Sequence, residues 1–126
     1  MDKELIGFSR QAVGRRGEDI ANTYLKALGC KVVARNWYSG HNELDIVVEE
    51  PCFIRFVEVR TLVYPNVVEP FETIGILKQQ KVIKAARAFI VKNRINKEVV
   101  FDVVSIVLNG NDFRLEYIKN AFTPLW

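Results

Sequence analysis

Two strand-like segments joined by a very short connection constrain the fold of this chain more than any other feature. In Glu43–Glu49, large apolar side chains occupy every second position, which is the period of a β-strand. Phe53–Arg60 is a second apolar run, and only Glu50-Pro51-Cys52 lies between the two. So short a link joins antiparallel neighbours, because parallel strands need a long crossover. We therefore expect a β-hairpin, or part of a meander, in the middle of the chain.

Helical patterns lie on both sides of this hairpin. Apolar positions three and four residues apart follow Gly14–Glu18 and predict a helix that ends at Gly29. A proline-containing loop, Leu62–Glu72, leads to a second helix that we expect to begin at Glu72 or Thr73 and to end near Asn93. The remaining expected elements are a strand Cys30–Tyr38, a turn Ser39–Asn42, strands Val99–Leu108 and Phe113–Ile118 around a hairpin turn Asn109–Asp112, and a short tail Ala121–Trp126.

The order of these elements is α-β-β-β-α-β-β. It predicts an α/β fold in which a mixed central sheet is flanked by helices. The 126 residues suffice for one domain, which we take as residues 1–126, with residues 1–13 as a candidate mobile segment because their pattern is mixed. Hydrophobic residues make up 49% of the chain, more than a disordered protein contains.

The sequence shows no sign of a membrane or secreted protein. No apolar run approaches the ~18 residues that cross a bilayer, and the N-terminus lacks the basic and apolar regions of a signal peptide. We expect a cytoplasmic protein without a membrane partner. Cys30 and Cys52 are far apart and are expected to be free thiols, and one histidine with two cysteines makes a structural zinc site unfavourable. The net charge of +3 permits a nucleic-acid partner without requiring one.

The hairpin carries a cluster of acidic residues. If Glu49 faces Ile54, the same antiparallel register sets Asp45 opposite Glu58, with about 5 Å between the Cβ atoms. Glu43 and Arg60 are each two residues from one of these acids and share their face. A slip of one residue in the register would separate the pair.

Carboxylates this close repel one another unless a proton or cation lies between them. Hard oxygen ligands suit Mg²⁺ or Mn²⁺, which lower the pKa of bound water and stabilise charge on a phosphate. Arg60 is suited to neutralising a phosphate oxygen, but a guanidinium cannot act as a general base. The alternative is an exposed strand face whose charges pair across strands, and the spacing alone favours that alternative.

Several short motifs resemble the YraN-like family of bacterial proteins from about Gly14 to Phe122. Each is weak alone, but their order and spacing together are specific. The matching segments are Gly17-Glu18, Asn36, Glu43-Leu44-Asp45-Ile46, Phe56-Val57-Glu58-Val59-Arg60, Lys78 with Lys81, Phe101-Asp102-Val103-Val104 and Asn120-Ala121-Phe122.

That family is similar to the restriction-endonuclease-like superfamily, which includes archaeal Holliday-junction resolvases. The resemblance implies a core of α-β-β-β-α-β and assigns roles. Asp45 and Glu58 would bind the metal, with the Val59 carbonyl as a further ligand, and Glu18 would approach from the first helix. Arg60 stands where active nucleases usually carry lysine, and Asn42 replaces the glycine that usually precedes Glu43.

Basic residues are candidates for nucleic-acid binding. Lys78 and Lys81 border the apolar stripe of the second helix, so their ammonium groups can extend toward the strand carboxylates. Arg10, Arg15 and Arg16, near the first helix, could add a phosphate-binding rim. The alternative is an ordinary solvated basic face. No aromatic platform for base stacking is apparent in the sequence.

Three further features are secondary candidates for a functional role. His41 is expected to be a surface turn residue, with an accessory proton donor as the alternative, and Asp102 a buried acid with a hydrogen-bond partner or a secondary site residue. The loop residues Val67, Val68 and Phe71 are a candidate contact surface, and a homodimer is left open.

Three functions remain open from the sequence. The first is a Mg²⁺- or Mn²⁺-dependent nuclease acting on DNA, branched or single-stranded. The second is a nucleic-acid-binding or assembly protein that kept a nuclease-like fold without efficient cleavage. The third is a structural interaction domain in which the acids have no ligand.

Overall fold

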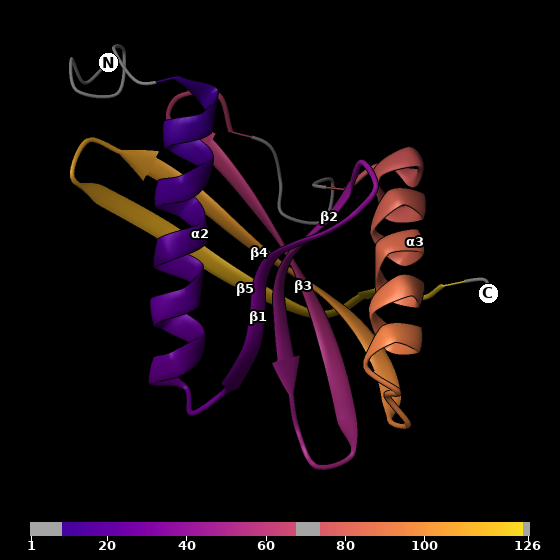
Figure 1. Ribbon diagram of the computed structural model, residues 1–126. Coiled ribbons are helices and arrows are strands. Elements are labelled where there is room, and N and C mark those ends of the chain that lie inside the picture. Colours follow the sequence, from indigo (N-terminus) through magenta and orange to yellow (C-terminus); the bar gives the residue numbers. More distant parts are fainter. Residues whose placement is uncertain (1–8, 68–73, 125–126) are drawn as a thin grey trace.

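The computed structural model describes residues 9–67 and 74–124 (Figure 1). These residues form two helices and five strands in the order α-β-β-β-α-β-β, as predicted. The elements are α2 (Arg10–Ala27), β1 (Lys31–Ser39), β2 (Asn42–Glu49), β3 (Phe53–Val63), α3 (Ile76–Lys92), β4 (Glu98–Asn109) and β5 (Asp112–Phe122).

The five strands form one mixed sheet in the order β1-β2-β3-β4-β5. Neighbours are antiparallel except β3 and β4, which are parallel because α3 connects them as a crossover. In the central hairpin Glu49 pairs with Ile54, so the register expected from the sequence is confirmed. The expected α/β class with a mixed sheet is confirmed as well.

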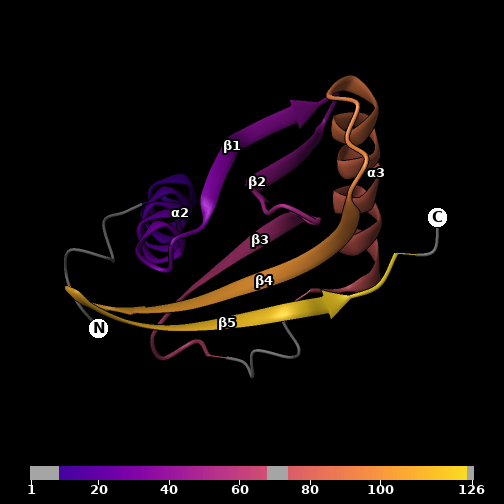
Figure 2. The ribbon, with the colours of Figure 1, turned by 90° about the horizontal axis from the view of Figure 1, so that it is seen from below.

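The helices α2 and α3 cover opposite faces of the sheet (Figure 2). On the α2 side, Ala21 and Leu25 pack against buried strand residues such as Val57 and Ile106. On the α3 side, Val82, Ala85, Ala86 and Phe89 pack against a second group that includes Leu44, Phe56 and Phe101. The central strands β3 and β4 are therefore covered on both faces, which explains their nearly continuous apolar sequence.

Helix α2 begins at Arg10, four residues before the expected opening at Gly14. Its N-cap is Ser9, whose side chain accepts a hydrogen bond from the Ala12 N–H. Residues 10–13 of the candidate mobile segment are thus helical, and residues 1–8 lie outside the described part. The predicted stop is confirmed, because Gly29 follows the helix with a φ of 89°.

Strand ends also differ from the expectations. β3 continues from Arg60 to Val63 because its backbone stays paired with β4 as far as Leu108. β5 continues through Ala121 to Phe122, where Phe122 pairs with Phe101. Helix α3 begins at Ile76, later than expected, and residues 68–73 of the predicted loop and helix start lie outside the described part.

Helix α2 comes close to the sheet at Gly17. A Cβ atom at this position would overlap the Thr61 side chain on β3, so only glycine fits without a shift. This close approach brings the next residue, Glu18, toward the strands that carry the acidic cluster.

Candidate metal site

Asp45 occupies the point where β2 separates from β3. The paired part of the two strands ends at Ile46 and Val57, so Asp45 and Glu58 lie directly beyond the last pair. There the Asp45 Oδ2 atom accepts a hydrogen bond of 2.8 Å from the backbone N–H of Val59. The predicted hairpin therefore places the Asp45 carboxylate against the main chain of β3.

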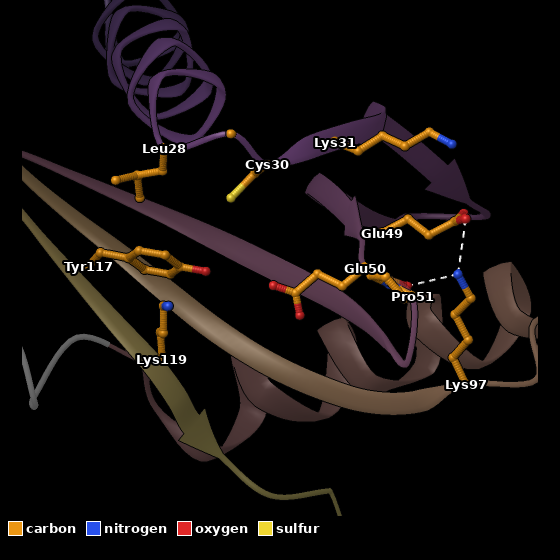
Figure 3. A pocket seen from close by; sticks show the side chains of 10 residues that line it. Leu28, Cys30, Lys31, Glu49, Glu50, Pro51, Lys97, Tyr117 and Lys119 are labelled. Atoms are coloured by element: carbon orange, nitrogen blue, oxygen red, sulfur yellow. Dashed lines mark hydrogen bonds and ion pairs between the residues drawn. The ribbon is translucent and has the colours of Figure 1, made fainter.

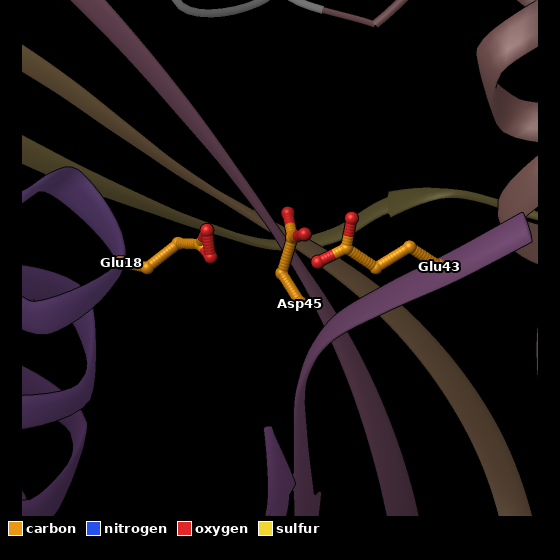
Figure 4. Close-up of side chains that lie close together, drawn as sticks. All are labelled: Glu18, Glu43 and Asp45. Atoms are coloured by element: carbon orange, nitrogen blue, oxygen red, sulfur yellow. The ribbon is translucent and has the colours of Figure 1, made fainter. Parts of the chain in front are cut away.

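Three carboxylates from two elements, α2 and β2, meet at this point (Figure 4). Glu18 of α2, Glu43 of β2 and Asp45 of β2 each offer one oxygen, and these oxygens all lie within 4.8 Å of one another. In Figure 4, the Glu18 and Glu43 side chains point toward Asp45 from opposite sides. Distances of this size allow one small cation to contact oxygens of all three residues.

Asn36 of β1 holds two of these carboxylates. With its amide nitrogen facing the acids, it donates hydrogen bonds to Glu43 Oε1 (2.9 Å) and Glu18 Oε2 (2.8 Å). Its φ of 48° is left-handed, a conformation that asparagine tolerates better than most residues. No role for Asn36 was predicted from the sequence. Its place among the segments that match the YraN-like family was the one indication that it belongs to the site.

Glu58 lies on the α3 side of Asp45 and is 4% exposed. Its Oε1 atom is 3.2 Å from Lys78 Nζ, whereas no donor among the described residues satisfies the buried Oε2. Leaving a buried carboxylate oxygen without a partner is costly unless a proton or cation supplies one. A proton shared with the neighbouring Asp45 carboxyl, or a cation, would satisfy this oxygen.

The pKa values of the acids in the cluster also indicate mutual repulsion. Burial, followed by the negative charges of Asp45 and Glu43, raises the pKa of Glu18 from 4.5 to about 7. Burial also raises the pKa of Asp45, against the opposing effect of the Val59 N–H. Burial and then the charge of Asp45 raise the pKa of Glu58, while Lys78 opposes the rise. The protein thus holds these acids together at an electrostatic cost that a divalent cation would remove.

The residues present therefore suit Mg²⁺ or Mn²⁺. The sequence predicts Asp45, Glu58 and the Val59 carbonyl as ligands, with Glu18 approaching from the first helix, and this ligand set stays a prediction. The oxygens that lie within 4.8 Å of one another belong to Glu18, Glu43 and Asp45, and Glu58 lies beside Asp45. Val59 contributes its N–H to Asp45, and its carbonyl remains a predicted ligand.

The basic candidates are spread around the cluster. Lys78 reaches Glu58, and Lys81 lies one turn further along α3 with an exposed side chain. Arg60 is half-buried on β3, two residues past Glu58, where it pairs with Ser105 of β4.

Arg15 is exposed on α2, but Arg16 donates a 2.8 Å hydrogen bond to the Gly110 carbonyl and so secures the β4–β5 turn.

Asp102 belongs to a separate buried network. It is fully buried and accepts hydrogen bonds from the Arg55 guanidinium, the Tyr117 hydroxyl (2.6 Å) and the Asn120 N–H (2.8 Å). Asn120 has a φ of 52°, so Asp102 fixes an irregular turn of β5. The hydrogen-bonded partner expected for this acid is present. His41 is exposed in the β1–β2 turn. Of the three apolar loop residues predicted to form a contact surface, Val67 lies among the described residues, whereas Val68 and Phe71 lie outside them.

A cavity of about 600 Å³ lies at the other end of β2, beside the β2–β3 turn (Figure 3). Its acidic groups are already paired. Lys97 Nζ lies 3.0 Å from Glu49 Oε1, and Arg55 Nε donates to Glu50 Oε2 at 3.1 Å. The carboxylates of this cavity are therefore already neutralised by ion pairs, so the Glu18–Glu43–Asp45 group is the stronger candidate for a metal site.

Neither described helix has the length and apolar character that crossing a membrane requires.

Comparison with known proteins places the sequence in a bacterial group. A model of the uncharacterised protein family UPF0102 matches residues 17–106, which include all the carboxylates of the cluster.

Full-length relatives agree. A UPF0102 protein of Chloroherpeton thalassium is 38% identical over 112 residues, covering 88% of this chain and 82% of the relative. One of Bacteroides thetaiotaomicron is 34% identical, covering 89% and 93%, and one of Desulforapulum autotrophicum is 38% identical, covering 90% and 94%. These matches confirm the YraN-like resemblance, and the chain belongs to the uncharacterised protein family UPF0102.

Proposed function

We propose that this protein is a divalent-cation-dependent nuclease that acts on the phosphodiester backbone of DNA. One observation carries the proposal: carboxylates from α2 and β2 converge within 4.8 Å beside the buried, unpartnered Oε2 of Glu58. Charge repulsion and burial both oppose such an arrangement in a purely structural role. The resemblance to restriction-endonuclease-like proteins points to the same chemistry.

Glu18, Glu43 and Asp45 would hold the Mg²⁺ or Mn²⁺ ion, and Glu58 would complete its surroundings. The bound ion would supply Lewis acidity toward a phosphate oxygen and lower the pKa of a water molecule. Asn36 orients Glu18 and Glu43, and the Val59 N–H orients Asp45, so the ligands are fixed by neighbours from other strands.

The cations of the site have separate tasks in this proposal. Lys78 neutralises Glu58 from the α3 side and is 48% exposed, so its ammonium group can also meet a phosphate. Arg60 and Lys81 would offset the charge that develops on the phosphate during cleavage. No sequence-specific reading of bases is proposed, because phosphate contacts position a nucleic acid without specifying it.

The alternative is a nucleic-acid-binding or assembly protein that keeps the cluster without cleaving. It is favoured by Arg60, which stands at the usual place of a lysine, and by the ion pair that already engages Glu58 with Lys78. In this alternative the cation would serve binding alone.

The experiment is a cleavage assay on linear, single-stranded and branched DNA with Mg²⁺ and with Mn²⁺. Wild type is compared with Asp45→Asn, Glu58→Gln and a control, Glu116→Gln, which changes an exposed acid on β5. Cleavage by wild type and the control, with loss of at least about 100-fold in Asp45→Asn, is expected. DNA binding without cleavage would select the alternative. Equal cleavage by wild type and Asp45→Asn would refute the catalytic assignment.

A further inference from the structure

A small cavity adjoins the acidic cluster between α2 and β1. It has a volume of about 210 Å³ and is lined by Arg15, Glu18, Asp19, Arg35 and Asn36. Glu18 and Asn36 belong to both places, since they also form the hydrogen bond that holds the cluster. A group bound in this cavity would therefore lie next to whatever the three carboxylates bind.

The backbone of β1 explains why two consecutive residues face this cavity. Successive side chains of a regular strand point to opposite faces, so Arg35 and Asn36 should diverge. Asn36 has a φ of 48°, which breaks this alternation, while Arg35–Ile46 and Trp37–Leu44 remain paired in one register on either side. A left-handed asparagine thus brings an amide and a guanidinium to the same side of the edge strand, facing α2.

Among the described residues, the Arg35 guanidinium has one hydrogen bond, to Asp19. The guanidinium has five N–H donors, and one nitrogen contacts Asp19 Oδ1 at 2.8 Å. The Asp19 side chain is 71% exposed, so this ion pair is solvated and readily exchanged. Arg15 lines the same cavity from α2 and is exposed. Two guanidiniums beside a small polar cavity suit a phosphate, whose oxygens match the guanidinium fork.

We propose that Arg35 and Arg15 bind a backbone phosphate of the nucleic acid, adjacent to the phosphate that meets the Glu18–Glu43–Asp45 group. This proposal rests on the proposed function and adds the path of the DNA strand, which passes over the small cavity between α2 and β1. Glu18 and Asp19 repel an anion in this cavity unless a cation neutralises the cluster. Phosphate binding by Arg35 is therefore coupled to the divalent ion.

Binding of fluorescein-labelled single-stranded and duplex DNA tests the proposal by fluorescence anisotropy. Ca²⁺ replaces Mg²⁺, the DNA is checked for integrity, and salt is varied between about 50 and 200 mM. The variants are Arg35→Ala, Arg15→Ala and Asp19→Asn, with Lys31→Ala at the far end of β1 as a control. Asp19→Asn breaks the ion pair but leaves Arg35 in place, so it separates a phosphate contact from a structural role.

Arg35→Ala and Arg15→Ala are each expected to weaken Ca²⁺-dependent binding roughly tenfold and to reduce the salt slope by about one. Asp19→Asn should bind as tightly as wild type or more tightly, and Lys31→Ala should match wild type. Two results would overturn the proposed phosphate contact without affecting the proposed function. Either Arg35→Ala binds DNA as tightly as wild type, or Asp19→Asn weakens binding as much as Arg35→Ala does. A wild-type protein that binds no DNA in the presence of Ca²⁺ overturns both the phosphate contact and the proposed function.

Discussion

Lys78 of α3 meets Glu58 of β3 with 3.2 Å between Nζ and Oε1, so the crossover helix supplies the cation that faces the most buried acid of the site. Burial alone would lower the pKa of Lys78, but the charges of Glu58, Asp45 and Glu43 raise it overall. Lys78 therefore stays protonated and lowers the repulsion within the cluster.

Replacing Lys78 by methionine keeps the stem and removes this charge. Because Lys78 lowers the pKa of Glu58, its loss should raise that pKa further and shift cation binding to higher pH. Stability at neutral pH should fall by about 1–3 kcal/mol, because the buried Glu58 carboxylate loses the partner of its Oε1 atom. Mn²⁺ titrations at several pH values measure the shift. Lys81→Met is the matched control, and an equal shift in both variants would contradict the specific role of Lys78.

The cation-free protein should lose stability as the pH rises. Glu18, Asp45 and Glu58 all have raised pKa values, so the folded state binds more protons than the unfolded state between the ordinary and the raised values. The stabilisation is complete below about pH 4.5 and is lost as the pH passes 7, the region of the Glu18 pKa.

Urea unfolding between pH 5 and pH 9 with a chelator measures this dependence. The free energy of unfolding should fall across the range, and saturating Mn²⁺ should reverse the fall. The Asp45→Asn, Glu58→Gln double variant should show a flatter profile. A wild-type profile that rises from pH 5 to pH 8 in chelator would be inconsistent with a strained acidic cluster.

Asn36→Gly should separate the two features of Asn36. Glycine accepts the φ of 48° but lacks the amide that holds Glu18 and Glu43. Since partners of metal ligands typically affect affinity by about 10- to 100-fold, Mn²⁺ binding should weaken by at least about tenfold. Asn36→Ala should also lose about 1 kcal/mol of stability, because alanine is strained at this φ. Calorimetry and thermal unfolding measure the two effects, and wild-type Mn²⁺ affinity in Asn36→Gly would exclude the positioning role.

Gly17→Ala should destabilise the protein by about 1–3 kcal/mol, because its Cβ would overlap Thr61 on β3 and force α2 outward. Gly14→Ala in the same helix is the control. A Cβ there meets nothing within 4 Å, so that change should stabilise by roughly 0.5–1 kcal/mol. Urea unfolding gives both values, and equal effects at the two glycines would show that the close approach does not constrain the helix.

The part of the fold that follows from local sequence was predictable. The register assumed for the short turn around Pro51 is confirmed by the Glu49–Ile54 pair. The start of α2 was missed because Ser9 caps it before the apolar stripe begins. The end of β5 was missed because Asp102, a residue on another strand, fixes its irregular backbone at Asn120.

The candidate site divides in the same way. Glu43, Asp45 and Glu58 were predicted from strand periodicity and register, and Glu18 came from the family resemblance. The period itself is broken at Asp45, because Leu44 packs on the α3 side and Ile46 on the α2 side. Asn36 and Arg35 could not be derived from periodicity, because a left-handed residue in an edge strand breaks the alternation on which that reasoning depends. The contact between Lys78 and Glu58 depends on how α3 packs on the sheet. The sequence indicated only that Lys78 borders the apolar stripe of the helix.

Calorimetric titration of Mn²⁺ into the full chain tests the central claim most directly, because it measures cation binding without requiring a substrate. Wild type and Glu116→Gln should bind one ion per chain with equal affinity. Glu18→Gln, Glu43→Gln and Asp45→Asn should each weaken that binding by at least about tenfold, since each removes one charged ligand. No Mn²⁺ binding by the wild type, or binding that all three substitutions leave unchanged, would contradict the assignment of this cluster as a metal site.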